Sequence, residues 1–160
     1  MRFIGSALVA SAIVLGACSG GEKAPATDTA APAAAPAVAA TGTAAAITGT
    51  THEVKMLGDE KGYRFEPKDL TIKAGDGVKF VFVSGGPHNV AFNAADLPAD
   101  VVPQLDANFG ADKMAELSSK MTMTAGETIT ISFGNIKAGT YPFHCTPHLA
   151  MNMKGTITVQ

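Results

Sequence analysis

The sequence predicts an all-β protein whose packed domain is a β-sandwich. Two observations lead to this prediction: short stretches in which apolar and polar residues alternate, and turn residues between them. Hydrophobic residues make up 46% of the 160 residues, which is enough for a packed core. Much of the alanine lies before residue 47 and is not expected to join that core. Short alternating strands at this spacing are typical of two packed sheets.

The chain begins with a segment, residues 1–17, that has the pattern of an export signal. A short positive start precedes an apolar run that is too short to cross a bilayer. The run ends in Leu15-Gly16-Ala17-Cys18, which resembles the lipobox of bacterial lipoproteins. That resemblance implies cleavage before Cys18 and lipidation of its sulfur, which would anchor the protein to a membrane. The alternative is an ordinary signal peptide followed by a coincidental cysteine.

A tether and a domain follow the signal. Residues 18–46 consist mostly of alanine, proline, threonine and glycine, with almost no large apolar side chain. Such a composition cannot bury enough surface to offset the entropy of ordering, so we expect a disordered tether after the lipidated cysteine. Residues 47–160 then form the single domain.

Four stretches of the domain show strand-like alternation most clearly. In the stretch of residues 78–83, Phe80 and Phe82 fall on one face, and a Gly75-Asp76-Gly77 turn precedes this stretch. The four stretches are residues 70–74, 78–83, 128–133 and 156–159.

Residues 94–126 interrupt the strand pattern. Pro98 and Pro103 lie in this region, and a short helix is expected around residues 112–120. Between residues 94 and 127 there are six acidic side chains and two lysines. This acidic excursion could steer a basic partner such as a cytochrome, or it could simply keep a loop solvated.

Composition and charge exclude two classes of function. The formal net charge is −2, whereas recognition of nucleic-acid phosphates needs a basic face. No apolar run reaches the roughly 18 residues that a membrane-spanning helix needs. We therefore expect no nucleic-acid partner and no transmembrane helix.

The residues that carry chemistry lie near the C-terminus. Cys145, His148 and Met153 form a Cys-x2-His-x4-Met pattern, and His88 follows a glycine and a proline about sixty residues upstream. Two imidazoles and a thiolate with a weak axial thioether select copper and favour one-electron transfer. Zinc fits less well because a thioether is a poor zinc ligand. If Cys18 carries lipid, Cys145 is a lone thiol in an exported protein, and a bound metal would protect it.

At these residues the chain resembles plastocyanin and the other small blue-copper proteins, the cupredoxins. The resemblance covers nearly all of residues 62–160 and includes Phe65-Glu-Pro-Lys, Gly86-Pro-His-Asn-Val and Tyr141-x-Phe-x-Cys-x-Pro-His. It implies an eight-stranded Greek-key sandwich with one type 1 copper ion at one end. The implied copper ligands are His88, Cys145, His148 and Met153.

The resemblance leaves two methionines to compare as the axial ligand. The Cys-x2-His-x2-Met spacing that would use Met151 occurs among blue-copper proteins such as amicyanin. The family's axial methionine is usually followed by one residue and then a glycine, which Met153-Lys154-Gly155 matches. Met153 is therefore the predicted ligand, and Met151 is expected at the rim of the site.

Supporting roles around the ligands also follow from the resemblance. It implies that Asn89 hydrogen-bonds to the backbone near Thr146 and so connects the two ligand loops. Pro87 and Pro147 would restrict those loops, although either could be an ordinary turn proline.

By strand parity, Tyr141 and Phe143 should point inward with Cys145, while His144 should point outward. A solvated surface histidine is the favoured interpretation of His144. An electron port and a second metal ligand remain as alternatives.

The predicted function is that of an electron carrier rather than an enzyme. A different class of function is a Cu(I) carrier that delivers copper to an oxidase or similar target, for which the methionines near the motif argue. A nitrite-reductase-like enzyme would need a second cupredoxin domain and more than the four histidines present.

The expected setting is the periplasmic or cell-envelope face of a membrane, with the protein a monomer anchored through Cys18. Ser19 weakly favours the outer membrane, because the aspartate that retains many lipoproteins at the inner membrane is absent there. A small apolar face of Pro87, Leu149, Ala150 and Met151 around His148 would dock redox partners such as a c-type cytochrome or a terminal oxidase.

Overall fold

The computed structural model describes residues 43–160. The predicted signal peptide, the lipidation site at Cys18 and the tether up to residue 42 lie outside the described residues. Within residues 43–160, no helix is both long enough and apolar enough to cross a membrane.

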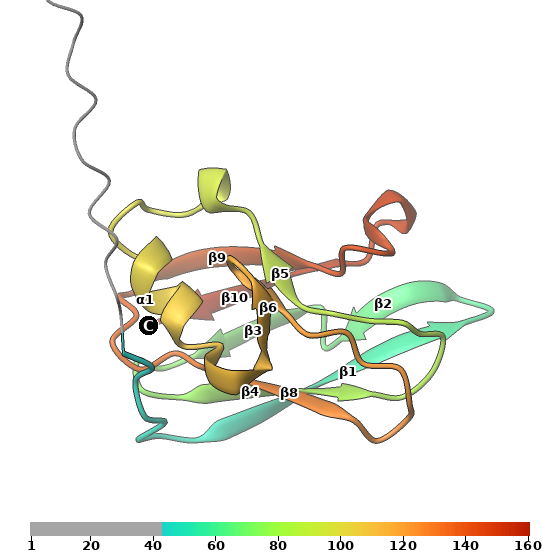
Figure 1. The fold of residues 1–160 in the computed structure, drawn as a ribbon, viewed down its shortest axis with the longest axis horizontal. Helices are drawn as coiled ribbons and strands as arrows, with labels where there is room; N and C mark the ends of the chain where they lie inside the picture. Colours follow the sequence, from blue (N-terminus) through green and yellow to red (C-terminus); the bar gives the residue numbers. More distant parts are fainter. Residues whose placement is uncertain (1–42) are drawn as a thin grey trace, which may run out of the picture. The chain divides into compact units, whose positions relative to one another are not determined.

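The described chain forms two β-sheets that pack on each other, which confirms the predicted all-β sandwich (Figure 1). The four-stranded sheet runs, in spatial order, β2 (Gly62–Glu66), β1 (Thr51–Asp59), β4 (Gly77–Phe82) and β8 (Thr128–Ser132). The six-stranded sheet runs β3 (Asp69–Ile72), β10 (Lys154–Val159), β9 (Gly139–His144), β5 (Ala91–Phe92), β7 (Ser118–Ser119) and β6 (Lys113–Ala115). β1 pairs in parallel with β4, and β3 with β10, while the other pairings are antiparallel.

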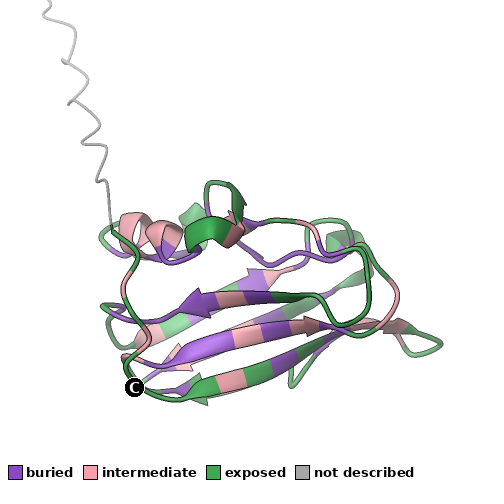
Figure 2. Ribbon diagram, turned by 60° about the horizontal axis from the view of Figure 1, so that its bottom comes forward, coloured by how far each residue is buried: buried purple, intermediate pink, exposed green. Residues whose placement is uncertain are grey.

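Side chains from both sheets meet in one apolar core. Figure 2 shows buried and exposed residues alternating along the strands, as the sequence pattern predicts. Phe80 of β4 and Phe143 of β9 lie across the sandwich from each other, with ring centroids 5.4 Å apart in an edge-to-face arrangement. Phe65 of β2 packs against both rings. Tyr141, Phe143 and Cys145 are all buried, so the predicted inward parity along β9 is confirmed.

The helix predicted around residues 112–120 is wrong. That stretch contains the end of the 3₁₀ turn η2 (Gly110–Asp112) and the short strands β6 and β7. Leu117, between the two strands, is buried with a φ of 52°, which no α-helix contains. Its N–H donates to the Asp106 carboxylate and its carbonyl accepts from Phe92 N–H, so contacts with distant residues hold the extended form.

The helix lies earlier, as α1 (Val102–Ala107), with Pro103 in its first turn, where a missing N–H costs nothing. A 3₁₀ turn η1 (Ala94–Asp96) precedes it. The described residues contain ten strands, including the short β6 and β7, where the resemblance implies eight.

Residues 43–50 cross one end of the sandwich before β1 begins. Thr48 and Gly49 donate their N–H groups to the Gly75 carbonyl, and Ala45 N–H donates to the buried Asn108 side chain. The contacts of the described chain with the domain therefore start before residue 47. This end also holds the C-terminus, and it lies opposite the 3₁₀ turn η3 (Leu149–Met151) (Figure 1).

Asp76 anchors this crossing segment to the turn between β3 and β4. Its buried carboxylate accepts hydrogen bonds from Lys73 N–H, the His52 ring and Thr50 N–H, at 3.0, 2.8 and 2.8 Å. These donors lower the pKa of Asp76 to about 2, with the Lys73 N–H as the largest cause.

Candidate metal centre

The predicted ligands come from two loops at the end of the sandwich that carries η3. His88 lies in the loop between β4 and β5, and Cys145 follows directly after β9. His148 precedes η3, and Met153 is the last residue before β10. The connection between β9 and β10 therefore contains three of the four residues. Folding places His88 beside them from the loop between β4 and β5.

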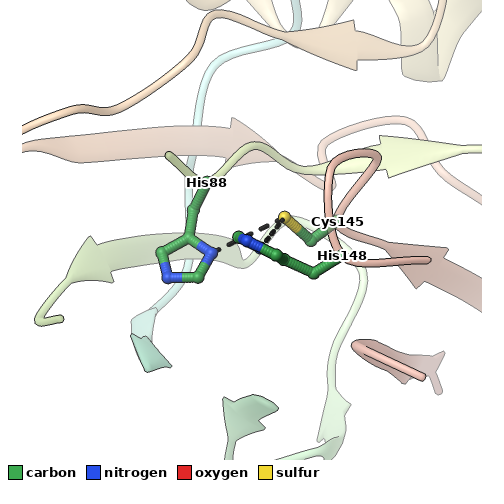
Figure 3. Close-up of side chains that lie close together, drawn as sticks. All are labelled: His88, Cys145 and His148. Carbon is green, nitrogen blue, oxygen red and sulfur yellow. Dashed lines mark hydrogen bonds between the residues drawn. The ribbon is translucent and has the colours of Figure 1, made fainter. Parts of the chain in front are cut away.

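The structure places His88, Cys145 and His148 together as a cluster of metal-binding side chains. One ligand atom from each residue lies within 4.8 Å of those of the other two. The Cys145 Sγ is 3.4 Å from His148 Nδ1 and 3.6 Å from His88 Nδ1, and both Nδ1 atoms face the sulfur (Figure 3). His88 and Cys145 are fully buried, and His148 is 5% exposed. Two imidazoles and one thiol in a buried cluster fit copper.

His88 is oriented by the main chain. Its Nε2 lies 2.8 Å from the Ser84 carbonyl, so this nitrogen carries the proton and donates it. The Nδ1 lone pair is then free to face a metal ion. Reciprocal backbone hydrogen bonds between His88 and Thr122 hold the loop itself in place.

The electrostatics of the cluster suit a cation. Burial lowers the pKa of His88 and of His148, so both rings are neutral near pH 7 and can act as ligands. Burial also raises the pKa of the Cys145 thiol, an effect that the backbone N–H groups of Asn89 and His148 partly offset. A bound cation would therefore be what keeps this buried sulfur as a thiolate.

Met153 and Met151 occupy different environments. Met153 is fully buried, and its carbonyl accepts the Cys145 N–H while its own N–H donates to the His148 carbonyl. Met151, in η3, is 56% exposed. This contrast favours Met153 as the thioether ligand, which stays a prediction.

Asn89 joins the two ligand loops. Its Oδ1 accepts the Thr146 N–H at 2.7 Å, which is the backbone contact expected for it. Its Nδ2 donates to the Thr146 hydroxyl at 3.2 Å and to the Ser118 hydroxyl at 3.1 Å. Pro87 and Pro147 are exposed and each precedes a ligand histidine, so their roles in restricting the loops stay predictions.

His144 is half-buried rather than fully solvated, and it lies outside the cluster. It lies opposite Lys154 of β10 and lines a cavity of about 590 Å³, together with Lys68 and Asp96. Burial lowers the pKa of His144, and the neighbouring Lys154 lowers it further.

Lysines neutralise half of the carboxylates in the acidic region between residues 94 and 127. Asp106 pairs with Lys113, Asp112 pairs with Lys120 at 2.7 Å, and Asp100 pairs with Lys137 at 2.7 Å. Three of the six carboxylates therefore contribute little net field, which weakens the argument that this region steers a basic partner.

Sequence reasoning missed Tyr63 of β2. Its ring stacks on the His148 ring with centroids 3.7 Å apart and planes 14° apart. The alternation of Tyr63 with the buried Phe65 could have placed it on the inner face of its strand. Nothing in the sequence indicates that this face reaches a histidine 85 positions away, which only the folded structure brings near.

Comparison with known proteins agrees with the geometry. The sequence model of one protein family, the copper binding proteins of the plastocyanin/azurin family, matches residues 52–160. A plastocyanin from Nostoc punctiforme is 43% identical over 113 residues, which are 69% of this chain and 74% of that protein. One from Prochlorothrix hollandica is 39% identical over 110 residues, 69% of this chain and 73% of that protein. Among solved structures, a mutant plastocyanin of a fern has 34% identity and a TM-score of 0.48, covering 68% of this chain and 99% of that one.

Proposed function

The chain belongs to the plastocyanin/azurin family of copper-binding proteins and is a copper electron-transfer protein, and we propose that it carries one electron at a time on a single type 1 copper ion. The family consists of electron carriers, so no catalytic residue is assigned. The proposed ligands are His88, Cys145, His148 and Met153. The observation that carries this assignment is the buried cluster of two imidazole nitrogens and one sulfur.

The residues around the cluster hold the ligands in one geometry. Copper, when bound, supplies the Cu(II)/Cu(I) couple. Ser84 orients His88, and Asn89 fixes the backbone beside Cys145. Because the ligand positions are fixed by the surrounding protein, little rearrangement is needed when the charge of the site changes. Burial of the ligands also excludes water.

A Cu(I) carrier is the alternative, and burial argues against it. A carrier needs a site from which a partner can extract metal, whereas two of the three clustered side chains are fully buried and the third is 5% exposed. Met151 and Met123 are exposed at the surface, so neither belongs to the buried cluster.

The proposed working location is the cell envelope, with the domain anchored through lipid on Cys18. The lipobox-like Leu15-Gly16-Ala17-Cys18 supports this proposal. Labelling cells with a radioactive fatty acid should mark the wild-type protein and leave Cys18→Ser unlabelled. If both proteins remain unlabelled, the anchor is wrong and the export signal is an ordinary one.

Redox partners are proposed to dock at the end of the domain that carries His148. Leu149 and Met151 are 41% and 56% exposed there, and Pro87 is exposed as well. Val83, one residue before Ser84, is 40% exposed. An apolar face of this kind suits brief encounters with a c-type cytochrome or a terminal oxidase, and we propose that the protein meets them as a monomer.

The visible spectrum tests the copper assignment. Cu(II) is added to the chain from Thr43 to Gln160, and excess metal is removed. We expect an intense blue thiolate-to-copper band that ascorbate bleaches and that Cys145→Ser abolishes, while Met151→Leu retains it. A colourless protein that holds Cu(I) tightly would instead favour the copper carrier, and a protein without bound copper would contradict both functions.

A further inference from the structure

Tyr63 covers one face of the proposed ligand His148. The two rings are nearly parallel, 3.7 Å apart at their centroids, which is a close stacking distance. The His88 ring is also near His148, with centroids 4.9 Å apart and planes 65° apart. His148 therefore packs against two aromatic rings, of which Tyr63 is the one stacked on its face.

The two histidines of the cluster differ in how they are oriented. His88 donates from Nε2 to the Ser84 carbonyl, which is the usual way in which a protein orients a metal-binding imidazole. For His148, the side-chain hydrogen-bond contact present within residues 43–160 is the one to Cys145, on the metal side of the ring. No hydrogen bond to the outer nitrogen of His148 takes the place of the Ser84 contact in the described structure. Stacking on Tyr63 is a contact on the face of the ring that can fix its plane.

The surrounding backbone is shaped to admit the Tyr63 ring. Gly58 lies opposite Tyr63 in the pairing of β1 with β2. A Cβ at Gly58 would lie 2.7 Å from Tyr63 Cε1 and 2.8 Å from Gly85 Cα. Gly85 itself has a φ of 73°, which favours glycine. Gly58 therefore leaves the space that the tyrosine ring fills, and Gly85 allows the chain to approach the Gly58 backbone closely.

The ring of Tyr63, rather than its hydroxyl, makes the contact. Within residues 43–160 the hydroxyl forms no hydrogen bond, whereas the ring is packed against the core and against both histidines. A role that depends on the ring alone predicts that phenylalanine can replace this tyrosine.

We propose that Tyr63 is a positioning residue for the copper ligand His148: its ring holds the imidazole plane with Nδ1 facing Cys145, before metal binds and while it is bound. The inference rests on the copper site proposed above, since it assigns His148 as a ligand. A merely structural Tyr63 would contribute to folding stability but would leave the orientation of His148 and the retention of copper unchanged.

The first experiment measures how fast a chelator removes copper, at fixed pH, from the wild type, Tyr63→Phe and Tyr63→Leu. We expect removal from Tyr63→Leu to be about 2- to 10-fold faster, which is the order of effect that one aromatic pair contributes, and removal from Tyr63→Phe to match the wild type. Tyr141→Phe is the control: it removes a buried hydrogen bond to the Lys137 carbonyl without touching His148, so its rate should be that of the wild type. Equal rates for Tyr63→Leu and wild type, or equally fast removal from Tyr63→Phe, would overturn the proposal.

The second experiment needs no copper, so it separates failure of this inference from failure of the proposed function. NMR of the metal-free wild type should show nuclear Overhauser contacts between the Tyr63 and His148 rings, with a single set of His148 ring signals. In metal-free Tyr63→Leu these signals should broaden or multiply, while those of His88 stay single because Ser84 holds that ring. If Tyr63→Leu does not fold, the test rests on the nuclear Overhauser contacts of the wild type and on Tyr63→Phe. Their absence overturns the proposal, and their presence together with wild-type behaviour of Tyr63→Phe supports it.

Discussion

Asn89 offers a sharp test of how the two ligand loops are held together. Asn89→Ala removes all three side-chain hydrogen bonds that link the His88 loop to Thr146 and to Ser118. Asn89 is only 1% exposed, so these hydrogen bonds are shielded from solvent in the wild type.

The magnitude follows from counting those bonds. A hydrogen bond contributes about 0.5–1.5 kcal/mol net, so three of them bound the loss at roughly 1.5–4.5 kcal/mol. Thr146 is exposed and Ser118 is half-buried, so water can reach both partners and the loss should fall in the lower half of that range. We expect about 2–3 kcal/mol in the free energy of unfolding, which is roughly a 30- to 150-fold change in the folding equilibrium.

The assay is urea unfolding of the metal-free chain from Thr43 to Gln160. Ser118→Ala is the matched control, because it removes one of the three bonds and should cost about 1 kcal/mol. The loss in the double variant should be smaller than the sum of the two single losses, because both single variants remove the same bond between Asn89 and Ser118. A loss for Asn89→Ala no larger than that for Ser118→Ala would refute the claim that Asn89 connects the loops.

Three further predictions concern the core, the thioether and the far end of the domain. Phe143→Ala, which empties a site packed against Phe65 and Phe80, should destabilise the domain by about 3–5 kcal/mol in the same unfolding assay. Met153→Leu should change the visible spectrum and reduction potential of the copper-loaded protein, whereas the exposed Met151→Leu should leave both unchanged; the reverse result would exchange their roles. The pKa of Asp76 is held at about 2, below its ordinary value, so the stability it contributes is fully present above about pH 4 and is lost as the pH falls toward 2. Acid unfolding of Asp76→Asn should lack that part of the pH dependence, and an acid transition identical to the wild type would contradict it.

Several features of the fold could be read from local sequence. Alternation along β4, β8, β9 and β10 follows directly from the pleat of a strand, in which successive side chains point to opposite faces. The same rule placed Tyr141, Phe143 and Cys145 on the inner face of β9. Cys145 and His148 are three positions apart, so their meeting needs only one turn of chain.

Other features could not be read locally, because they depend on residues far apart in the chain. Residues 112–120 form a hairpin because Leu117 bonds to Asp106 and Phe92, which overrides any local helix preference. The acidic excursion loses much of its charge to lysines, one of which, Lys137, is 37 positions from its partner Asp100. Local pattern has no information about such pairings.

The sequence by itself determined the fold class, the family and the residues offered as copper ligands, because strand alternation and ligand spacing are properties of short segments. The tertiary structure added two neighbours of those ligands that the sequence did not indicate. Ser84 orients His88 within the loop between β4 and β5, and Tyr63 reaches His148 from the opposite sheet. The Tyr63 contact forms only when the two sheets pack on one another, so its partner is selected by packing and not by position along the chain.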